Sequence, residues 1–266
     1  MADWDNFDST GYADRNYGRG ILSEDLQIMR FVVAELRALR LSEESLESTA
    51  DVGAGPNLYP SLLLAPYIAA DGTLELIDRS ASNIRYLNRV VKEAGLEGPN
   101  TWSKFERCLR DLDHPTSVRK LRDVTEVRMG SIFELSAARY DAVMCFFVAE
   151  SITSDSGVFA TSLDRLMRSL KPGGVFVTAH MVGSTGYRAG PKEPYPACDL
   201  SMREIEESYE PYGTFRALLT SPSEREAVRP GYRGMAALVG RRERCTTPSV
   251  LGHNTREPRK EVQWTH

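Results

Sequence analysis

The sequence feature that most constrains the fold is a glycine-rich turn directly after a strand-like run. Residues 48–52 lead into Gly53-Ala54-Gly55-Pro56, and a second strand-like run, TLELID, ends in Asp78 about 25 residues further on. Glycines let a backbone turn sharply and approach a ligand, and an acidic residue at the next strand end can accept hydrogen bonds from ribose hydroxyls. A glycine-rich turn alone can be only a turn, but Asp78 in register favours a site for an adenosine-containing cofactor.

Strand-like and helix-like segments alternate along most of the chain. Helical periodicity or capping signals mark residues 23–36, 57–64, 80–94, 159–170 and 202–209, and residues 95–124 form a less regular, partly helical excursion. Strand-like runs lie at 48–52, 73–78, 125–129, 141–147, 175–180, 214–221 and 234–240. The pattern predicts an α/β fold with a doubly wound, seven-stranded, mostly parallel, Rossmann-like sheet that ends in an antiparallel hairpin.

The two ends of the chain have different characters. Residues 1–20 lack a sustained period but contain Trp4, Phe7, Tyr12 and Tyr17, which need a surface to pack on. We expect one domain over residues 1–240, in which residues 1–45 form an N-terminal lid and helix. Residues 241–266 have no periodicity and are expected to form a polar tail, flexible or packed without specific contacts.

Composition narrows the classes of partner. The formal charge of −4 gives no net attraction to phosphate backbones, so we expect no nucleic-acid partner. The four cysteines are widely separated, without CxxC spacing, which indicates neither a metal site nor a disulfide framework. The acidic, polar start and the lack of a long apolar run favour a soluble, cytoplasmic protein without a membrane partner.

The residues after the glycine turn bear on which cofactor binds there. A dinucleotide site generally has a third glycine, in GxGxxG, and an open helix N-terminus that receives the diphosphate. In this chain Pro56, Leu58 and Tyr59 fill that region. A cofactor without phosphate therefore suits the turn better than NAD, and S-adenosylmethionine (SAM) is such a cofactor.

The chain resembles a known family of class I methyltransferases, the group that contains nicotinamide N-methyltransferase, phenylethanolamine N-methyltransferase and thioether methyltransferase. The resemblance runs from about Phe7 to Arg242 and is most specific where DVGAGPNLY is joined to a leading Tyr-x4-Tyr. The LKPGG motif is less specific, because it is shared more widely. The matching pieces are GYADRNY, DVGAGPNLY, LIDRSASN, the Trp102 and Ser103 pair, DAVMCFF, LKPGGVFV, the loop with Ser184 and Tyr187, and GMAALVGRR.

The resemblance implies a set of cofactor-binding residues. Tyr12 and Tyr17 would cover SAM, and Asp78 with Asn83 would hold its ribose. Ser131 stands where the nicotinamide enzyme has an acidic residue that meets the adenine amino group, so we expect a weaker contact there. The full set is Tyr12, Tyr17, Gly53, Ala54, Gly55, Tyr59, Asp78, Arg79, Asn83, Ser131, Ile132 and Phe146.

A second set is expected to surround the methyl acceptor, because the carboxyl ends of parallel strands hold the ligands of such sheets. Tyr12, Glu150 and His180 are the candidate catalytic residues, and an imidazole titrates near neutrality. His180 stands where the nicotinamide enzyme has a substrate-contacting aspartate, which argues against nicotinamide as acceptor. Both residues also have an interpretation without a catalytic role. His180 would then only form a hydrogen bond at the end of a strand, and Glu150 would only be solvated. The expected substrate-binding residues are Tyr12, Phe147, His180, Ser184 and Tyr187.

These features lead to one expected function and two alternatives. We expect methyl transfer from SAM to a nitrogen, or secondarily an oxygen or sulfur, of a small molecule, in specialised metabolite biosynthesis. The product would be S-adenosylhomocysteine (SAH), no metal would take part, and the protein would be a monomer or homodimer. One alternative is a SAM-binding sensor or partner subunit without catalysis. The other is a methyltransferase that acts on RNA or protein, and only the basic runs RRER and REPRK in the tail support it.

Overall fold

The computed structural model describes residues 4–18, 20–93, 101–187, 194–222 and 230–244, and it contains a seven-stranded sheet. The strand order is β3-β2-β1-β4-β5-β7-β6. Neighbours from β3 to β5 run parallel, whereas β7 is antiparallel to both β5 and β6. This arrangement confirms the predicted fold. The strands are β1 (Leu46–Val52), β2 (Ile68–Asp78), β3 (Thr125–Met129), β4 (Tyr140–Phe146), β5 (Leu170–Val182), β6 (Gly213–Leu219) and β7 (Gly234–Arg242).

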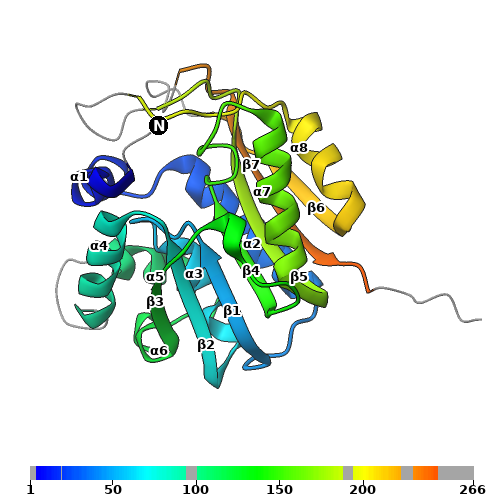
Figure 1. Cartoon of the computed structure of the whole chain (residues 1–266). Coiled ribbons are helices and arrows are strands. Elements are labelled where there is room, and N and C mark those ends of the chain that lie inside the picture. Colours follow the sequence, from blue (N-terminus) through cyan, green and yellow to red (C-terminus); the bar gives the residue numbers. More distant parts are fainter. Residues whose placement is uncertain (1–3, 19, 94–100, 188–193, 223–229, 245–266) are drawn as a thin grey trace, which may run out of the picture.

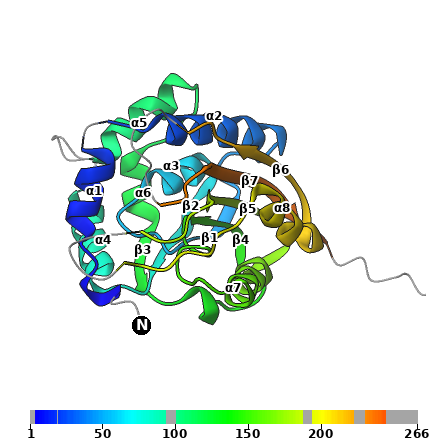
Figure 2. The ribbon, with the colours of Figure 1, turned by 90° about the horizontal axis from the view of Figure 1, so that it is seen from above.

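Helices cover both faces of the sheet, as Figures 1 and 2 show. One face packs against α2 (Ser23–Ala38), α3 (Tyr59–Leu64), α4 (Ala81–Glu93), α5 (Thr101–Asp111) and α6 (Val118–Val124). The other face packs against α7 (Ser156–Ser169) and α8 (Met202–Tyr209). Side chains alternate between the two cores along a strand, since Met144 belongs to the first and Cys145 to the second. Short 3-10 turns lie at η1 (Trp4–Asn6), η2 (Ala65–Tyr67), η3 (Ile132–Glu134) and η4 (Glu210–Tyr212).

The N-terminal segment is more ordered than its sequence indicates. Residues 9–17 form a helix, α1 (Ser9–Tyr17), which begins after Asp8, whose carboxylate accepts a hydrogen bond of 2.9 Å from the Gly11 N–H. We call residues 4–18 the N-terminal arm. The arm lies beside α4, at the end of the sheet where β1, β2 and β4 finish (Figure 1).

Three other segments refine the sequence-based boundaries. The described part of the 95–124 excursion contains α5 and α6, and Phe105 and Leu109 of α5 are buried where this helix packs against α3 and α6. Strand β5 begins at Leu170 rather than Val175. The expected tail lies outside the described residues from position 245 on, and β7 includes its first two residues. Over the described residues, no helix is both long enough and apolar enough to cross a membrane.

Candidate active site

The turn after β1 requires glycine for two separate reasons. Gly53 and Gly55 have φ angles of 69° and 52°, in the left-handed region that glycine adopts without strain. A Cβ atom on Gly53 would lie only 2.4 Å from Cγ2 of Val148. A Cβ atom on Gly55 would instead enter the space in front of Asp78, 4.0 Å from its Oδ2 atom. The first glycine therefore allows close packing, and the second keeps the approach to Asp78 open.

Asp78 ends β2 as a buried carboxylate held by three donors. Its Oδ2 atom accepts a hydrogen bond of 2.9 Å from the Gly55 N–H, and its Oδ1 atom accepts from the Ser80 N–H at 2.8 Å and from Asn83 Nδ2 at 3.2 Å. Burial raises the pKa of Asp78 above its ordinary value, although these hydrogen bonds oppose the rise. A carboxylate has about four lone-pair positions, so acceptor capacity remains for a ribose hydroxyl.

Asn83 connects this carboxylate to the N-terminal arm. Its side-chain oxygen accepts a hydrogen bond of 2.7 Å from the Ser9 hydroxyl, while its amide nitrogen donates to Asp78. The Ala81 N–H also donates to Asp5 of the arm, at 3.3 Å. The start of α4 thus connects the arm to the Asp78 carboxylate.

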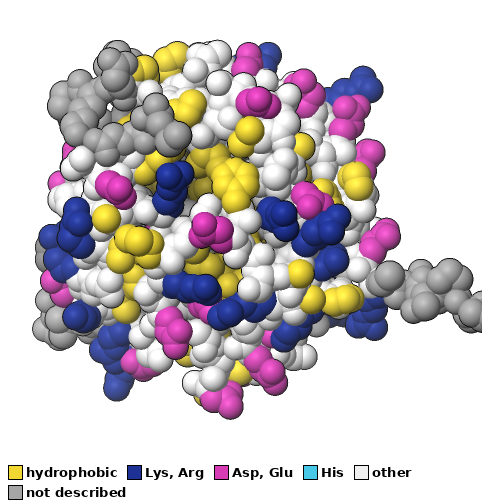
Figure 3. All heavy atoms as spheres, in the orientation of Figure 1, with side chains coloured by type: hydrophobic (Ala, Val, Ile, Leu, Met, Phe, Trp, Pro, Cys, Tyr) yellow, Lys and Arg dark blue, Asp and Glu magenta, His cyan; other side chains and the backbone are white. Residues whose placement is uncertain are grey.

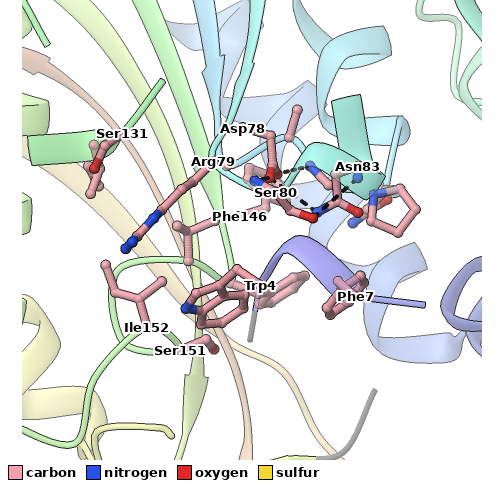
Figure 4. A pocket seen from close by; sticks show the side chains of 18 of the residues that line it. Trp4, Phe7, Asp78, Arg79, Ser80, Asn83, Ser131, Phe146, Ser151 and Ile152 are labelled. Carbon is pink, nitrogen blue, oxygen red and sulfur yellow. Dashed lines mark hydrogen bonds between the residues drawn. The ribbon is translucent and has the colours of Figure 1, made fainter. Parts of the chain in front are cut away.

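A cavity opens from the glycine turn across the ends of β2, β3 and β4 (Figure 4). From the end of β2, Arg79 extends across the cavity, and Ser131 caps η3, with its hydroxyl accepting a hydrogen bond from the Phe133 N–H at 3.3 Å. That hydroxyl keeps its own proton available for donation. This part of the lining consists of Asp78, Arg79, Ser80, Asn83, Gly130, Ser131, Ile132 and Phe133, and the turn contributes residues 53–57.

The rest of the cavity lining is aromatic, apolar or neutral. None of these side chains is charged among the described residues. In the space-filling view, hydrophobic side chains gather in a hollow in the middle of this face (Figure 3). The lining here consists of Trp4, Phe7, Tyr12, Phe146, Phe147, Val148, Ser151, Ile152, Val158 and Tyr187.

Ring contacts join the arm to the loop after β5. The Trp4 ring lies 4.6 Å from that of Tyr195, and the Phe7 ring lies 5.3 Å from Tyr12 and 5.6 Å from Tyr195. Tyr187 stacks on Tyr195 at 5.3 Å, and their backbones exchange two hydrogen bonds. We call these five side chains the aromatic seam. The sequence showed the arm's aromatic residues, but Trp4, Phe7 and Tyr195 were not assigned to the site.

Tyr17 and Tyr59 lie behind the cavity rather than in its lining. The Tyr59 ring stacks on Phe105 at 5.0 Å and meets Phe146 edge-on at 5.6 Å, and Tyr17 contacts Phe105 edge-on at 5.4 Å. The Tyr59 hydroxyl donates to Asp25 Oδ1 at 2.9 Å. The role of both tyrosines toward the methionine part of SAM stays a prediction.

Glu150 and His180 also lie outside the lining, and they bind each other. His180 Nδ1 is 2.8 Å from Glu150 Oε2, and His180 Nε2 is 2.8 Å from the Tyr209 hydroxyl. Glu150 Oε1 accepts hydrogen bonds from the Ser151 hydroxyl and from the Met181 N–H, so its carboxylate is fully engaged. The expectation that both side chains face the acceptor is therefore not matched by their placement, and a direct catalytic role stays a prediction.

The remaining expected substrate residues divide in the same way. Tyr12, Phe147 and Tyr187 line the cavity, whereas Ser184 is fully buried outside it. Ser151 was missed, although it is the polar side chain that connects the cavity to Glu150. The sequence could have indicated Ser151, because it directly follows Glu150, which was predicted to lie in the site.

Topology and site together define a class I SAM-dependent methyltransferase. The strand order, the glycine turn after β1, the acidic end of β2 and the antiparallel β6–β7 pair are the features of that class. The model of the NNMT/PNMT/TEMT family matches residues 2–243. The chain belongs to this family, and the resemblance noted from sequence is confirmed.

Solved structures agree at the level of the fold. A SAM-dependent methyltransferase from Methanosarcina mazei is 14% identical with a TM-score of 0.52, covering 78% of this chain and 97% of that chain. The YcgJ protein from Bacillus subtilis is 11% identical with a TM-score of 0.50, over 80% and 98% of the two chains. TehB from Haemophilus influenzae is 12% identical with a TM-score of 0.50, over 88% and 67%. No curated protein has a significantly similar sequence.

Proposed function

We propose that this methyltransferase transfers the methyl group of SAM to a nitrogen atom of a small heteroaromatic molecule. The observation that carries the proposal is the distribution of charge in the cavity lining. Asp78 and Arg79 are its charged residues within the described chain, and both lie at the carboxyl end of β2, where the adenosine would bind. The acceptor end offers aromatic faces and a few neutral polar groups, which suit a flat, uncharged ring.

The residues that would hold SAM fit its three parts. Asp78 and Asn83 would bind the ribose, Ser131 and Ile132 with the planar guanidinium of Arg79 would flank the adenine, and residues 53–57 would lie along the methionine part. Asn57 fits as well, because its buried Oδ1 atom has no hydrogen-bond partner within the described chain and can accept from an amino group. When bound, SAM supplies a methyl group on a positively charged sulfur.

The protein's own task is positioning and water exclusion. Methyl transfer is an in-line displacement, so its rate depends on holding the acceptor lone pair against the methyl carbon. A ring nitrogen with a free lone pair needs no prior loss of a proton, which accords with the engagement of Glu150 and His180 in each other. Aromatic faces favour the positive charge that passes to the acceptor, and the aromatic seam shields the cavity from water.

We also propose where the reaction takes place and with which partners. The acceptor would be an intermediate of specialised metabolism in the cytoplasm, with oxygen or sulfur atoms as secondary targets. The protein would act without metal, membrane or nucleic acid, as a monomer or homodimer. On the face shown in Figure 3, acidic and basic side chains are interspersed rather than gathered into a basic stripe, which supports a small acceptor.

Calorimetric titration with SAM, SAH and NAD tests the cofactor, and transfer of a labelled methyl group to a panel of heteroaromatic, amine and thioether compounds tests the acceptor. We expect SAM and SAH to bind and NAD not to bind. Asp78→Ala should abolish binding, whereas Asp71→Ala, which removes an exposed carboxylate on the same strand, should not. Binding of NAD alone would overturn the proposal, and SAM binding without transfer to any compound would favour a non-catalytic sensor.

A further inference from the structure

A buried series of hydrogen bonds behind the cavity reaches the lining at Ser151. The Ser151 hydroxyl donates to Glu150 Oε1 at 2.8 Å, and Glu150 Oε2 lies 2.8 Å from His180 Nδ1. His180 Nε2 in turn lies 2.8 Å from the Tyr209 hydroxyl. All four residues are 1% exposed or less, and Ser151 lines the cavity (Figure 4). Ser151 therefore connects a buried carboxylate to the space in which the methyl acceptor would lie.

The backbone around Ser151 is fixed by the protein itself. The chain turns after β4 at Phe147, whose φ of 61° is rare for a bulky residue; such strain is found mostly at functional sites. The Ser151 N–H donates to the Val148 carbonyl at 2.8 Å, and the Glu150 carbonyl accepts from the Cys198 N–H at 2.7 Å. The turn thus holds Glu150 inside the protein and the next residue at the cavity.

The buried carboxylate fixes the direction of the hydrogen bond that Ser151 makes with a ligand. A hydroxyl has one proton, and that of Ser151 is donated to Glu150. A hydrogen bond to a carboxylate is about twice as strong as one to a neutral acceptor, so the proton stays on that side. Toward the cavity, the Ser151 oxygen therefore accepts hydrogen bonds. Its donation to Glu150 also makes it a better acceptor, because consecutive hydrogen bonds polarise one another.

We propose that Ser151 determines acceptor specificity. It selects a heteroaromatic molecule that carries an N–H donor, on the ring or as an amino substituent, besides the nitrogen that receives the methyl group. Glu150 is a positioning residue that acts through Ser151. In the reaction, the nitrogen lone pair bonds to the methyl carbon while the carbon–sulfur bond breaks and leaves its electron pair on sulfur. The N–H proton stays on the acceptor.

The same hydrogen bond favours the reaction as well as binding. Methyl transfer places positive charge on the acceptor ring, which makes its N–H a stronger donor. The bond from this N–H to the Ser151 oxygen is therefore stronger in the transition state than in the ground state, and it raises the rate of the chemical step.

The inference rests on the proposed function, and matched pairs of compounds test the two separately. The members of a pair share a ring nitrogen and differ in an N–H donor: the aminopyridine isomers are paired with pyridine, and benzimidazole with N-methylbenzimidazole. One measurement is the single-turnover rate of transfer of a labelled methyl group from SAM. The other is calorimetric binding of each compound to the protein loaded with SAH. Differences in nucleophilicity cancel when each compound is compared between wild type and variant.

Three substitutions locate the effect. Ser151→Ala should lower the rate preference for the donor-bearing compound about tenfold, as for one hydrogen bond to a charged group, and the binding preference less. Glu150→Gln should also lower the preference, but add little in the Ser151→Ala background, because it acts through Ser151. Ser162→Ala is the matched control, since it removes a buried hydroxyl outside the cavity lining that donates to the Phe159 carbonyl at 2.7 Å.

The outcomes distinguish the two proposals. A binding preference that Ser151→Ala removes, without methyl transfer to any compound, would support the role of Ser151 and overturn the proposed function. Transfer to both members of a pair with equal losses in Ser151→Ala, or with none, would overturn the inference alone. The inference is also wrong if the wild-type protein prefers the donor-free compounds and Ser151→Ala removes that preference. Should Glu150→Gln fail to fold, Ser151→Ala alone makes the comparison.

Discussion

The Ser9 hydroxyl donates a hydrogen bond of 2.7 Å to the side-chain oxygen of Asn83, a residue 74 positions away in the sequence. The side-chain nitrogen of Asn83 in turn donates a hydrogen bond to the Asp78 carboxylate. Since Asp78 is the residue expected to hold the ribose, a cofactor that stabilises the Asp78–Asn83 pair also stabilises the attachment of the N-terminal arm. We therefore expect cofactor binding to strengthen the attachment of the arm through these three side chains.

Ser9→Ala should therefore weaken SAH binding about three- to tenfold, which corresponds to one buried hydrogen bond of roughly 1 kcal/mol. The melting temperature of the protein without cofactor should fall only slightly, because the substitution removes one hydrogen bond and leaves the core contacts of Ala13 and Tyr17 in place. Calorimetric titration measures the affinity. Thr10→Ala is a suitable control, since the neighbouring hydroxyl is exposed and meets Arg89 only at 3.5 Å. Equal effects of the two variants would remove the link between Ser9 and the cofactor.

Gly53→Ala should destabilise the protein by about 1 to 3 kcal/mol, because the residue has a left-handed φ and its new Cβ would overlap Val148. Urea unfolding measures the loss. Val148→Ala in the Gly53→Ala background should restore part of the stability by removing the overlap. If the second substitution only adds to the damage, crowding at Val148 is not the cause.

The buried Asp51 makes stability depend on pH in a direction opposite to that of a paired carboxylate. Burial raises its pKa from 3.8 to about 7, so the folded protein holds this proton more tightly than the unfolded chain. The contribution of Asp51 to the free energy of unfolding is therefore lost as the pH rises from about 4 to about 7. Asp51→Asn keeps an acceptor for the Ser61 hydroxyl, 2.7 Å away, without a charge to bury.

We expect the melting temperature of Asp51→Asn minus that of the wild type to be larger at pH 8 than at pH 5. His114, whose pKa burial lowers to about 4, changes stability in the opposite direction below its ordinary pKa. Because His114 is present in both proteins, its contribution cancels in the comparison. A difference between the two melting temperatures that does not change with pH would contradict this account of Asp51.

The Glu150–His180 pair should prove important for folding. His180→Phe leaves the Glu150 carboxylate, which is 0% exposed, without its counterpart and should cost about 3 to 5 kcal/mol. Glu150→Gln in the His180→Phe background should recover part of this loss, because an amide replaces the stranded charge. Chemical unfolding of the two single variants and the double variant measures the coupling. A stable His180→Phe protein that has lost only methyl transfer would return His180 to a catalytic role.

Much of the fold could be predicted because apolar periodicity reports directly on which faces are buried. The α8 run, Met202–Tyr209, matches its predicted bounds and buries Ile205 and Tyr209 on one face. The α1 helix has no apolar stripe of comparable regularity, and its position depends on contacts with α4 that are distant in sequence. Local pattern cannot report on such contacts.

Positions fixed by backbone topology could be predicted for the candidate site, whereas positions that depend on side-chain direction could not. The glycine turn and Asp78 occupy strand ends whose location follows from topology. His180 also ends a run of strand, but it shares the face of Phe176 and Val182, which packs against α7 and α8. Counting alternation along β5 from Phe176 would have placed it away from the cavity. The aromatic seam depends on contacts of Trp4, Phe7 and Tyr12 with Tyr195 and Tyr187, which no local pattern reveals.

The aromatic seam has a kinetic consequence. Four of its rings, those of Trp4, Phe7, Tyr12 and Tyr187, line the cavity proposed to hold cofactor and acceptor. We therefore expect both products to leave by separation of the arm from Tyr187 and Tyr195, which breaks the ring contacts in each turnover. We expect this opening, rather than bond making at the methyl carbon, to limit the steady-state rate once a good acceptor is supplied.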